Sequence, residues 1–235
     1  ERRLQVRDIV VYGTPRRIVL IARGMSEIQG DLTTEVVGPP KGVAFDKDGM
    51  PTKAAIGFAK GQGVDVSALR VKSTEKGEYL CIEKHEKGQK TRDILPAILE
   101  EALATITFPK AMRWNDTRAR FARPIKWILA LLNGEPLSLR FAGLVSGSVS
   151  YGHHFMRPGA FQVKGIEDYF DGMARNFVIV DQAERRRRIG DGVRAIAEEK
   201  GGSVVGEEEL FEEITFLTEY PVPICGRFDE AYLAL

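Results

Sequence analysis

The chain has 235 residues, with 34 Lys or Arg and 33 Asp or Glu, so its formal net charge is +1 at pH 7. With this balance the net charge gives no information about binding partners, so only local clusters of charge can indicate one. Cys81 and Cys225 lie too far apart in sequence to indicate a disulfide framework, so a reducing cytoplasm is the expected location. No apolar run approaches the roughly 18 residues of a membrane span, and no segment has the pattern of a signal peptide.

The first elements predicted are two strands of β-branched residues, at 7–14 and 18–22. Pro15 lies between them and suits a turn, because proline has a fixed φ and no N–H to donate. Arg16 and Arg17 would then lie where the second strand begins. They are either charges at the rim of the sheet or contacts to a phosphate or another partner.

A helix is expected after Thr52, which can cap it, and a hairpin is expected between residues 71–73 and 79–86. A longer helix is predicted for residues 92–105, because apolar side chains recur there every three or four positions.

No nucleotide-binding loop is predicted, since the glycines of residues 57–63 match neither a Walker motif nor a dinucleotide fingerprint. Neither a metal site nor a catalytic residue is predicted in this chain.

The central feature of the sequence is the basic run of residues 110–126, which contains only one acidic residue, Asp116. Basic residues among aromatic ones favour contacts to RNA phosphates and bases, although a strand pair with a basic rim is the alternative.

His153 belongs to a Gly-His-His-Phe sequence. Because adjacent strand residues point to opposite faces, His153 and His154 are not expected to share a metal or a proton. His153 is interpreted as a structural or RNA-contacting imidazole. The candidate RNA-binding residues are Lys110, Arg113, Trp114, Arg118, Arg120, Arg123, Lys126 and His153.

The most apolar run, residues 125–132, is predicted to be a central strand, and Asn133-Gly134 after it is the strongest hairpin signal in the chain. Residues 137–144 are expected to return as an alternating strand, with Leu137 and Leu139 on the same face.

The C-terminal part is predicted to alternate between helices and short strands, giving an α/β layer. The strands are expected at residues 178–180, 203–205 and 222–225. Asp181 is predicted to cap a helix that runs to about residue 200. The apolar stripe of this helix extends back onto the arginine run 185–188. We therefore expect either an internal carboxylate partner for these arginines or an anionic partner molecule.

Several motifs, in one order along the chain, resemble the β chain of the bacterial two-chain glycyl-tRNA synthetase. The similarity covers essentially the whole chain, which corresponds to the N-terminal third of the family's β chain without its first strand and helix. We therefore expect the sequence to be a piece of a longer protein. The motifs are Thr14-Pro15-Arg16-Arg17, Asp48-Gly49-Met50-Pro51-Thr52-Lys53-Ala54-Ala55-Ile56-Gly57-Phe58-Ala59, Glu75-Lys76-Gly77-Glu78-Tyr79-Leu80, Phe108-Pro109-Lys110-Ala111-Met112-Arg113-Trp114 and Val180-Asp181-Gln182-Ala183-Glu184-Arg185-Arg186.

The resemblance implies an α+β fold with mixed, mostly antiparallel sheets and flanking helices. It also implies two domains: a strand-rich one at residues 1–107, and a mixed one at 108–235 similar to the editing-type domain of the phenylalanyl-tRNA synthetase β chain. It further implies glycine–tRNA ligation in a cytoplasmic α2β2 enzyme, with ATP and Mg²⁺ on the α chain. The expected partners are the α chain, tRNA-Gly and the rest of the β chain, with no membrane.

The resemblance leaves three interpretations of this chain open. It is a non-catalytic part that engages tRNA, an assembly module that docks the α chain or another segment of β, or a vestigial amino-acid pocket. Active editing is not expected, because glycine is the smallest amino acid and a second sieve would have no smaller product to remove.

Overall fold

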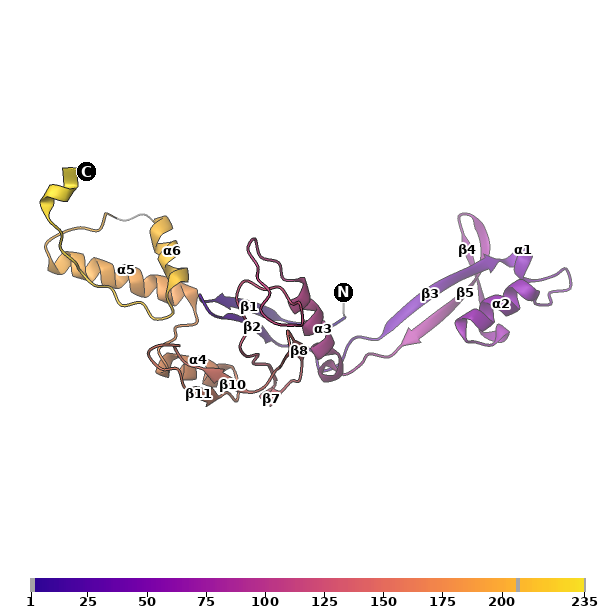
Figure 1. Cartoon of the computed structure of the whole chain (residues 1–235). Coiled ribbons are helices and arrows are strands. Elements are labelled where there is room, and N and C mark those ends of the chain that lie inside the picture. The colour runs from indigo at the N-terminus through magenta and orange to yellow at the C-terminus, as the bar shows by residue number, and fades with distance from the viewer. Residues whose placement is uncertain (1–2, 206–207, 235) are drawn as a thin grey trace. The chain divides into compact units, whose positions relative to one another are not determined.

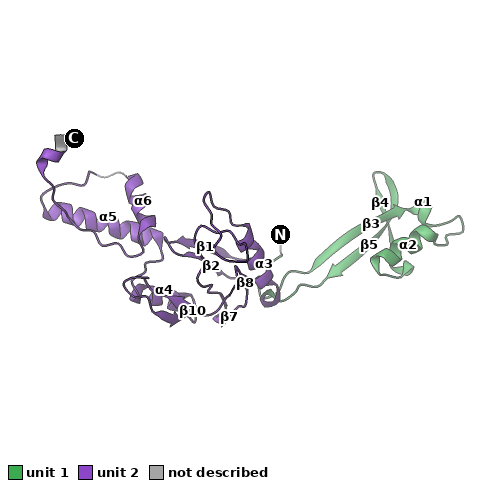
Figure 2. Cartoon of the chain, in the orientation of Figure 1, with its two compact units in different colours: residues 1–5, 26–91 green, residues 6–25, 92–235 purple. Residues whose placement is uncertain are grey.

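The computed structural model describes residues 3–205 and 208–234 (Figure 1). They form two compact units, one of residues 3–5 and 26–91 and the other of residues 6–25, 92–205 and 208–234 (Figure 2). The predicted α+β class is confirmed, since small antiparallel sheets occur with helices in both units. Residues 6–25 and 92–107 belong to the second unit, together with the C-terminal part of the chain.

The first unit is built on a three-stranded antiparallel sheet in the order β3-β5-β4. Its strands are β3 (Leu32–Pro40), β4 (Arg70–Thr74) and β5 (Gly77–Glu86). The predicted hairpin between the last two strands is confirmed, with Thr74 opposite Gly77 at its turn.

Three short helices lie beside this sheet: α1 (Lys41–Ala44), α2 (Lys53–Gln62) and the 3-10 helix η1 (Val66–Ala68). Thr52 caps α2 as predicted, because its side chain accepts a hydrogen bond from the Ala54 N–H at 3.2 Å. A hydrophobic cluster of Ala44, Ala55 and Leu80 lies in the core of the unit, with Phe45, Phe58 and Leu69 packed against it.

The second unit begins with the predicted hairpin of β1 (Asp8–Gly13) and β2 (Ile18–Arg23), which pair antiparallel. Tyr12 and Val19 face the core, where Tyr12 packs edge-on against Phe170 with ring centroids 5.3 Å apart. One hydrophobic cluster in the core of this unit contains the buried residues Val163, Tyr169, Met173, Val178 and Val180. Burial raises the pKa of the Tyr169 hydroxyl to about 12, because the charged form would be desolvated.

The prediction of a long central strand at 125–132 is wrong. Only β6 (Leu131–Leu132) is a strand, and it pairs with β7 (Glu135–Pro136). The preceding residues instead contact an irregular segment, since the Ala130 N–H donates to the Gly147 carbonyl at 3.1 Å. The turn prediction is confirmed, because Asn133 and Gly134 both have the positive φ, 52° and 84°, that a two-residue hairpin requires.

The return segment alternates as predicted, with Leu137 and Leu139 buried. It contributes only the short strand β8 (Arg140–Phe141), which pairs with β9 (Leu144–Val145). A further hairpin follows, formed by β10 (Val149–Tyr151) and β11 (Ala160–Gln162).

The helices of the second unit are α3 (Thr91–Thr105), α4 (Ile166–Arg175), α5 (Gln182–Glu199), α6 (Glu208–Leu217) and the 3-10 helix η2 (Glu230–Ala234). The predicted cap of α5 is confirmed, because Asp181 Oδ1 accepts a hydrogen bond from the Ala183 N–H at 2.8 Å. None of the helices in the described residues is both long and apolar enough to cross a membrane.

The α/β layer predicted for the C-terminal part is wrong. Residues 178–180 are buried but form no strand, and residues 203–205 and 222–225 are also irregular. The carbonyl groups of Ile179 and Val180 accept hydrogen bonds from the Arg185 guanidinium, and the Ile179 N–H donates to the Glu219 carbonyl at 2.9 Å. These contacts, rather than a neighbouring strand, pair this buried backbone.

Candidate nucleic-acid interface

Residues 110–126, here called the basic segment, follow α3 and form a loop rather than a strand. The loop is closed by a backbone pair between Met112 and Phe121. The Met112 N–H donates to the Phe121 carbonyl at 2.9 Å, and the Phe121 N–H donates to the Met112 carbonyl at 3.2 Å. These two bonds fix the ends of the part that contains Arg113, Arg118 and Arg120.

Aromatic packing and one asparagine attach the loop to the rest of the second unit. The Phe121 ring packs edge-on against both Phe108, at 4.7 Å, and Phe141, at 6.4 Å. Asn115 Nδ2 donates to the Ala142 carbonyl at 2.7 Å, while Asn115 Oδ1 accepts from the Thr117 hydroxyl at 2.6 Å. The loop is therefore held at its base and close to its tip.

The cationic side chains of the basic segment all face solvent. None of them makes an ion pair or side-chain hydrogen bond with another residue in the described part of the chain. Trp114 is half-buried among them, and Asp116 is exposed and pairs with none of them. The positive charge of this surface is thus not compensated within the described residues. The cations are Lys110, Arg113, Arg118, Arg120, Arg123 and Lys126.

The end of the basic segment lies next to the turn that contains His153. Trp127, directly after Lys126, packs against Tyr151 with ring centroids 4.9 Å apart. The Arg17 guanidinium lies over the same Trp127 ring, 5.6 Å from its centroid. The structure therefore places His153 close to the end of the segment, although it describes no direct contact between His153 and the six cations.

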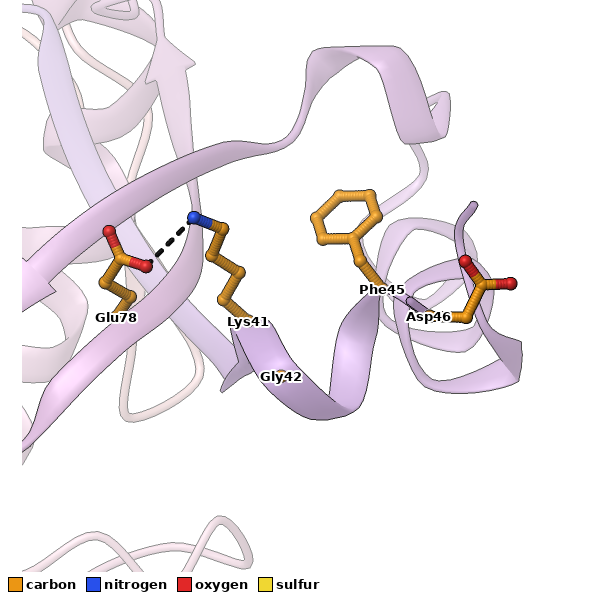
Figure 3. Close-up of a pocket in the computed structure, with 5 residues that line it drawn as sticks. All are labelled: Lys41, Gly42, Phe45, Asp46 and Glu78. Carbon is orange, nitrogen blue, oxygen red and sulfur yellow. Dashed lines mark hydrogen bonds and ion pairs between the residues drawn. The ribbon is translucent and has the colours of Figure 1, made fainter. Parts of the chain in front are cut away.

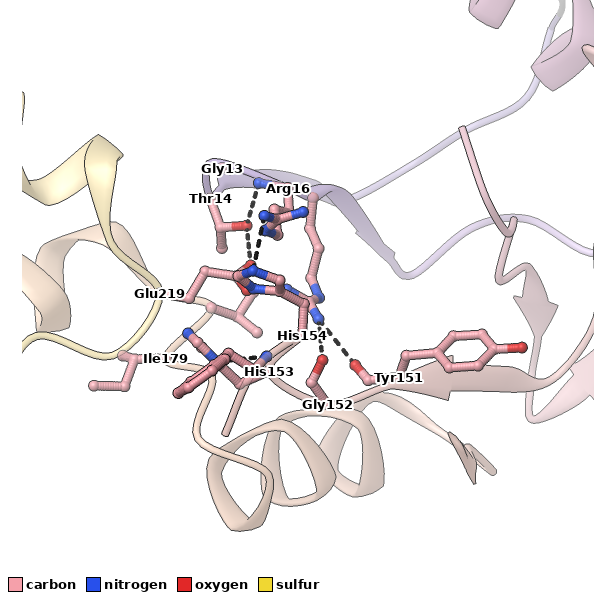
Figure 4. Close-up of polar contacts among 12 residues, drawn as sticks. Gly13, Thr14, Arg16, Tyr151, Gly152, His153, His154, Ile179 and Glu219 are labelled. Atoms are coloured by element: carbon pink, nitrogen blue, oxygen red, sulfur yellow. Dashed lines mark hydrogen bonds and ion pairs between the residues drawn. The ribbon is translucent and has the colours of Figure 1, made fainter. Parts of the chain in front are cut away.

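The two histidines lie in a turn after β10, and the expectation that they point to opposite faces of a strand is wrong (Figure 4). Their ring centroids are 5.2 Å apart. Arg16 Nη2 contacts His154 Nε2 at 3.0 Å, while His153 Nδ1 accepts hydrogen bonds from the backbone of the turn. Burial lowers the pKa of His153, and Glu219 opposes this shift. This fits a neutral imidazole that accepts through Nδ1.

A buried ion pair between Arg17 and Glu219 holds this turn against the β1–β2 hairpin. Arg17 is 8% exposed and Glu219 3% exposed. Arg17 Nη2 also donates to the carbonyls of Tyr151 and Gly152, at 2.9 and 2.8 Å, and the Thr14 hydroxyl donates to Glu219 at 2.6 Å. The interpretation of Arg17 as a rim charge is thus wrong. Its partner lies 202 positions away, and no local signal indicated it.

The arginine run 185–188 has internal partners, which was one of the two expected outcomes. Arg185 is fully buried and donates to the carbonyls of Gly13, Ile179, Val180 and Thr215 at 2.5–3.0 Å. Carbonyl oxygens therefore replace the carboxylate that we expected. Burial lowers the pKa of the Arg185 guanidinium, because desolvation disfavours its charged form.

The other three arginines of the run pair with carboxylates on the surface. Arg186 pairs with Glu208. Arg187 bonds both Glu184 and Asp191 at 2.9 Å, and Arg188 bonds Glu184 at 2.7 Å. These contacts lower the pKa of Glu184 to about 2, chiefly through the hydrogen bonds from Arg187 and Arg188. The run is therefore compensated by its own fold.

The first unit contains a surface hollow next to α1 (Figure 3). One wall is closed by an ion pair in which Lys41 Nζ lies 2.9 Å from Glu78 Oε2. This pair neutralises two of the three charged groups at the hollow. The third is the carboxylate of Asp46, whose Oδ1 accepts hydrogen bonds from the Asp48 and Met50 N–H groups, so the hollow presents no cluster of like charge. It is lined by Lys41, Gly42, Phe45, Asp46 and Glu78.

Comparison with known proteins decides the family. The family model described as glycyl-tRNA synthetase beta subunit matches residues 1–235, the whole chain. The chain belongs to the glycyl-tRNA synthetase β subunit family. This confirms the resemblance found in the sequence motifs.

Relatives of this chain are named glycine–tRNA ligase beta subunit. The protein from Syntrophus aciditrophicus is 44% identical over 235 residues, which are 100% of this chain and 34% of the relative. The protein from Trichlorobacter lovleyi is 46% identical over 227 residues, 97% of this chain and 33% of the relative. The protein from Moorella thermoacetica is 42% identical over 235 residues, 100% of this chain and 34% of the relative. The chain spans about a third of the length of these relatives.

Proposed function

We propose that this chain is a non-catalytic part of the β subunit of a glycine–tRNA ligase and that its basic segment engages the phosphates of tRNA-Gly. In this proposal the complete enzyme is a cytoplasmic α2β2 assembly whose α chain holds ATP and Mg²⁺ and joins glycine to the tRNA. Membership of the family, and relatives named as beta subunits of the ligase, support the general part of the proposal.

The observation that carries the RNA-binding part is the uncompensated charge of the basic segment. Its cations are exposed and have no anionic partner in the described residues. A cation without an internal partner gives up no ion pair when it contacts a phosphate, and each contact releases counterions from the RNA. The Met112–Phe121 pair and Asn115 hold the loop in place, so part of the ordering needed for binding is already present.

Binding of tRNA-Gly at several salt concentrations tests this proposal. We expect the double variant Arg118→Ala, Arg120→Ala in the complete β subunit to weaken binding. The slope of log K against log salt should fall by about 0.7–0.9 for each phosphate that the variant no longer neutralises. An unchanged slope would show that these residues are not on phosphate. The folded state should be unaffected, because both side chains are exposed.

A second candidate function is assembly, and the outer face of the β1–β2 hairpin favours it. Ile9, Val11, Ile18 and Leu20 lie on this face and are 53–56% exposed. A contiguous apolar face of this kind is typical of a protein contact. We propose that another segment of the β polypeptide covers it, since the relatives have about three times the length of this chain.

Thiol labelling tests the assembly proposal. The variant Val11→Cys should react readily in the 235-residue chain and slowly in the complete β subunit. Equal reactivity in both would contradict it. Protection that appears only when the α chain is added would show that the α chain, rather than the β polypeptide, is the occupant.

We also propose two domains, residues 1–107 and 108–235, the latter similar to an editing-type domain. A vestigial amino-acid pocket is the third candidate role of this chain. This part rests on the resemblance of the sequence motifs. Titration of the chain with glycine, alanine and phenylalanine tests it. A saturable signal would support a retained pocket, and its absence with all three would remove the pocket from the account.

A further inference from the structure

The turn of residues 153–157 presents an aromatic ring to solvent. Phe155 is 84% exposed, and the neighbouring Met156 is 44% exposed. A single exposed apolar residue is ordinary on a protein surface. What distinguishes Phe155 is the extent to which the backbone around it is fixed.

The turn is tied down on both sides of Phe155. The Arg157 N–H donates to the His153 carbonyl at 2.9 Å, and His153 Nδ1 accepts from the N–H groups of Phe155 and Met156, at 3.3 and 3.1 Å. Gly152 anchors the start, because its N–H donates to Gly159 and its carbonyl accepts from the buried Arg17. The ring is therefore held outward by a rigid backbone.

At position 152, where the turn is anchored, only glycine fits. A Cβ on Gly152 would lie 2.2 Å from the Arg157 carbonyl oxygen, which closes the far end of the same turn. The close approach of these two backbone segments depends on that glycine. The shape of the turn is thus set by specific residues rather than left to a mobile loop.

The surroundings of Phe155 are cationic. Arg16 contacts His154 at its Nε2 atom, and Arg157 has no anionic partner in the described residues. Residues 151–165 contain no Asp or Glu. The nearby carboxylate of Glu219 is buried and bonded to Arg17 and Thr14, so it does not offset this charge at the surface. An apolar protein surface would have to cover these cations without offering them an anion. A nucleotide offers both a π-face for the ring and a phosphate for a cation.

We propose that Phe155 is a stacking platform for an unpaired nucleobase of a bound RNA. The inference rests on the proposed function and extends it from phosphate contacts to a base contact. The Trp127–Tyr151 packing joins the end of the basic segment to the strand that leads into the turn, so one RNA strand can reach both. The base is unpaired, because the faces of paired bases are covered by their neighbours in a duplex.

The test uses an RNA hairpin with a single-stranded tail and the same hairpin trimmed to a blunt end. Both are bound to the complete β subunit in wild-type form and as the variants Phe155→Ala and Phe155→Trp. We expect Phe155→Ala to weaken binding of the tailed RNA by about tenfold or more. Binding of the blunt RNA and the salt slope should not change, because every cation that faces a phosphate is still present. Phe155→Trp should retain the affinity for the tailed RNA.

Fluorescence gives a direct readout of stacking. A 2-aminopurine placed in the tail should be quenched on binding to the wild-type protein and to Phe155→Trp, and remain bright with Phe155→Ala. Equal affinity and equal quenching for wild type and Phe155→Ala would overturn the inference. Loss of α-chain binding by Phe155→Ala, with RNA binding intact, would overturn it too, because the ring would then be a protein contact.

These outcomes separate the inference from the proposed function. If the wild-type protein binds neither RNA, the proposed function itself fails. If the wild type binds and Arg118→Ala, Arg120→Ala lowers the salt slope while Phe155→Ala changes nothing, only the stacking inference fails. Urea unfolding of Phe155→Ala serves as the folding control, and we expect no loss of stability because the ring is exposed.

Discussion

The second unit contains two dense groups of cations that differ in one respect. All four arginines of residues 185–188 bond to carbonyl or carboxylate groups of the same chain. The six cations of the basic segment have no such partner in the described residues. The difference shows that the density of positive charge in a sequence does not identify a binding surface. What matters is whether the fold supplies the counter-charge.

The cause of the difference lies in local structure. In helix α5 the carboxylates of Glu184 and Asp191 stand three or four positions from Arg187, so the helix itself brings opposite charges together. The basic segment has only Asp116 and forms a loop without such a repeat. Its cations consequently keep their full electrostatic reach for an external anion, within the screening length of the solution.

The largest expected effect comes from removing the buried arginine. Arg185→Met should lower the free energy of unfolding by about 3 kcal/mol or more, because it leaves buried carbonyl groups without a donor. Arg188→Met is the control and should cost under about 1 kcal/mol, as its ion pair is exposed. Urea unfolding monitored by circular dichroism measures both. Similar decreases for the two variants would contradict the division of the run into a buried and a solvated part.

A smaller loss of stability is expected when the hydrogen bond that attaches the basic segment to the second unit is removed. Asn115→Ala removes the bond to the Ala142 carbonyl and should lower the stability by about 1 kcal/mol. It should also weaken RNA binding by about fivefold, because the loop must then be ordered on binding. Ser138→Ala, an exposed change in the same unit, is the control. If Asn115→Ala binds RNA like the wild type, the fixed shape of the loop has no role in binding.

The smallest expected effect is a pH-dependent change in the free energy of unfolding, caused by the ion pairs of Glu184 with the arginine run 185–188. The pKa of Glu184 is lowered from 4.5 to about 2, so its ion pairs stabilise the folded state fully above about pH 4.5. This stabilisation declines as the pH falls towards 2 and is absent below it. Glu184→Gln should therefore be less stable than the wild type at pH 7, by under about 1 kcal/mol because the pairs are exposed, and equally stable near pH 2.

Unfolding measured at several pH values, with Glu213→Gln as a variant that removes an exposed carboxylate, checks this prediction. A stability difference between wild type and Glu184→Gln that stays constant from pH 7 to 2 would be inconsistent with it. The same result would mean that the surface arginines do not depend on Glu184 for their counter-charge.

The sequence predicted those parts of the fold that depend on neighbouring residues. The turn at Asn133-Gly134 and the caps at Thr52 and Asp181 follow from the chemistry of a few adjacent positions. The strand expected at 125–132 did not form, because Leu129 and Leu131 pack against the core without a sheet partner along the whole run, and the Ala130 N–H donates to the Gly147 carbonyl of an irregular segment.

The buried polar contacts were beyond local reasoning for a different reason. Arg17 and Glu219 are 202 positions apart in sequence, so no local pattern pairs them. The sequence did predict which residues form the cationic group at 110–126. It could not predict that the group lacks an internal partner, because that depends on every carboxylate that the fold brings near or keeps away.

The most direct test of the account is a salt titration of tRNA-Gly binding by two matched double variants of the complete β subunit. Arg118→Ala, Arg120→Ala removes two uncompensated cations, and Arg187→Ala, Arg188→Ala removes two compensated ones. We predict that the first variant lowers the salt slope by about 0.7–0.9 per phosphate released and that the second leaves it unchanged. Equal reductions in slope, or a reduction only in the second variant, would contradict the claim that the uncompensated segment holds the RNA.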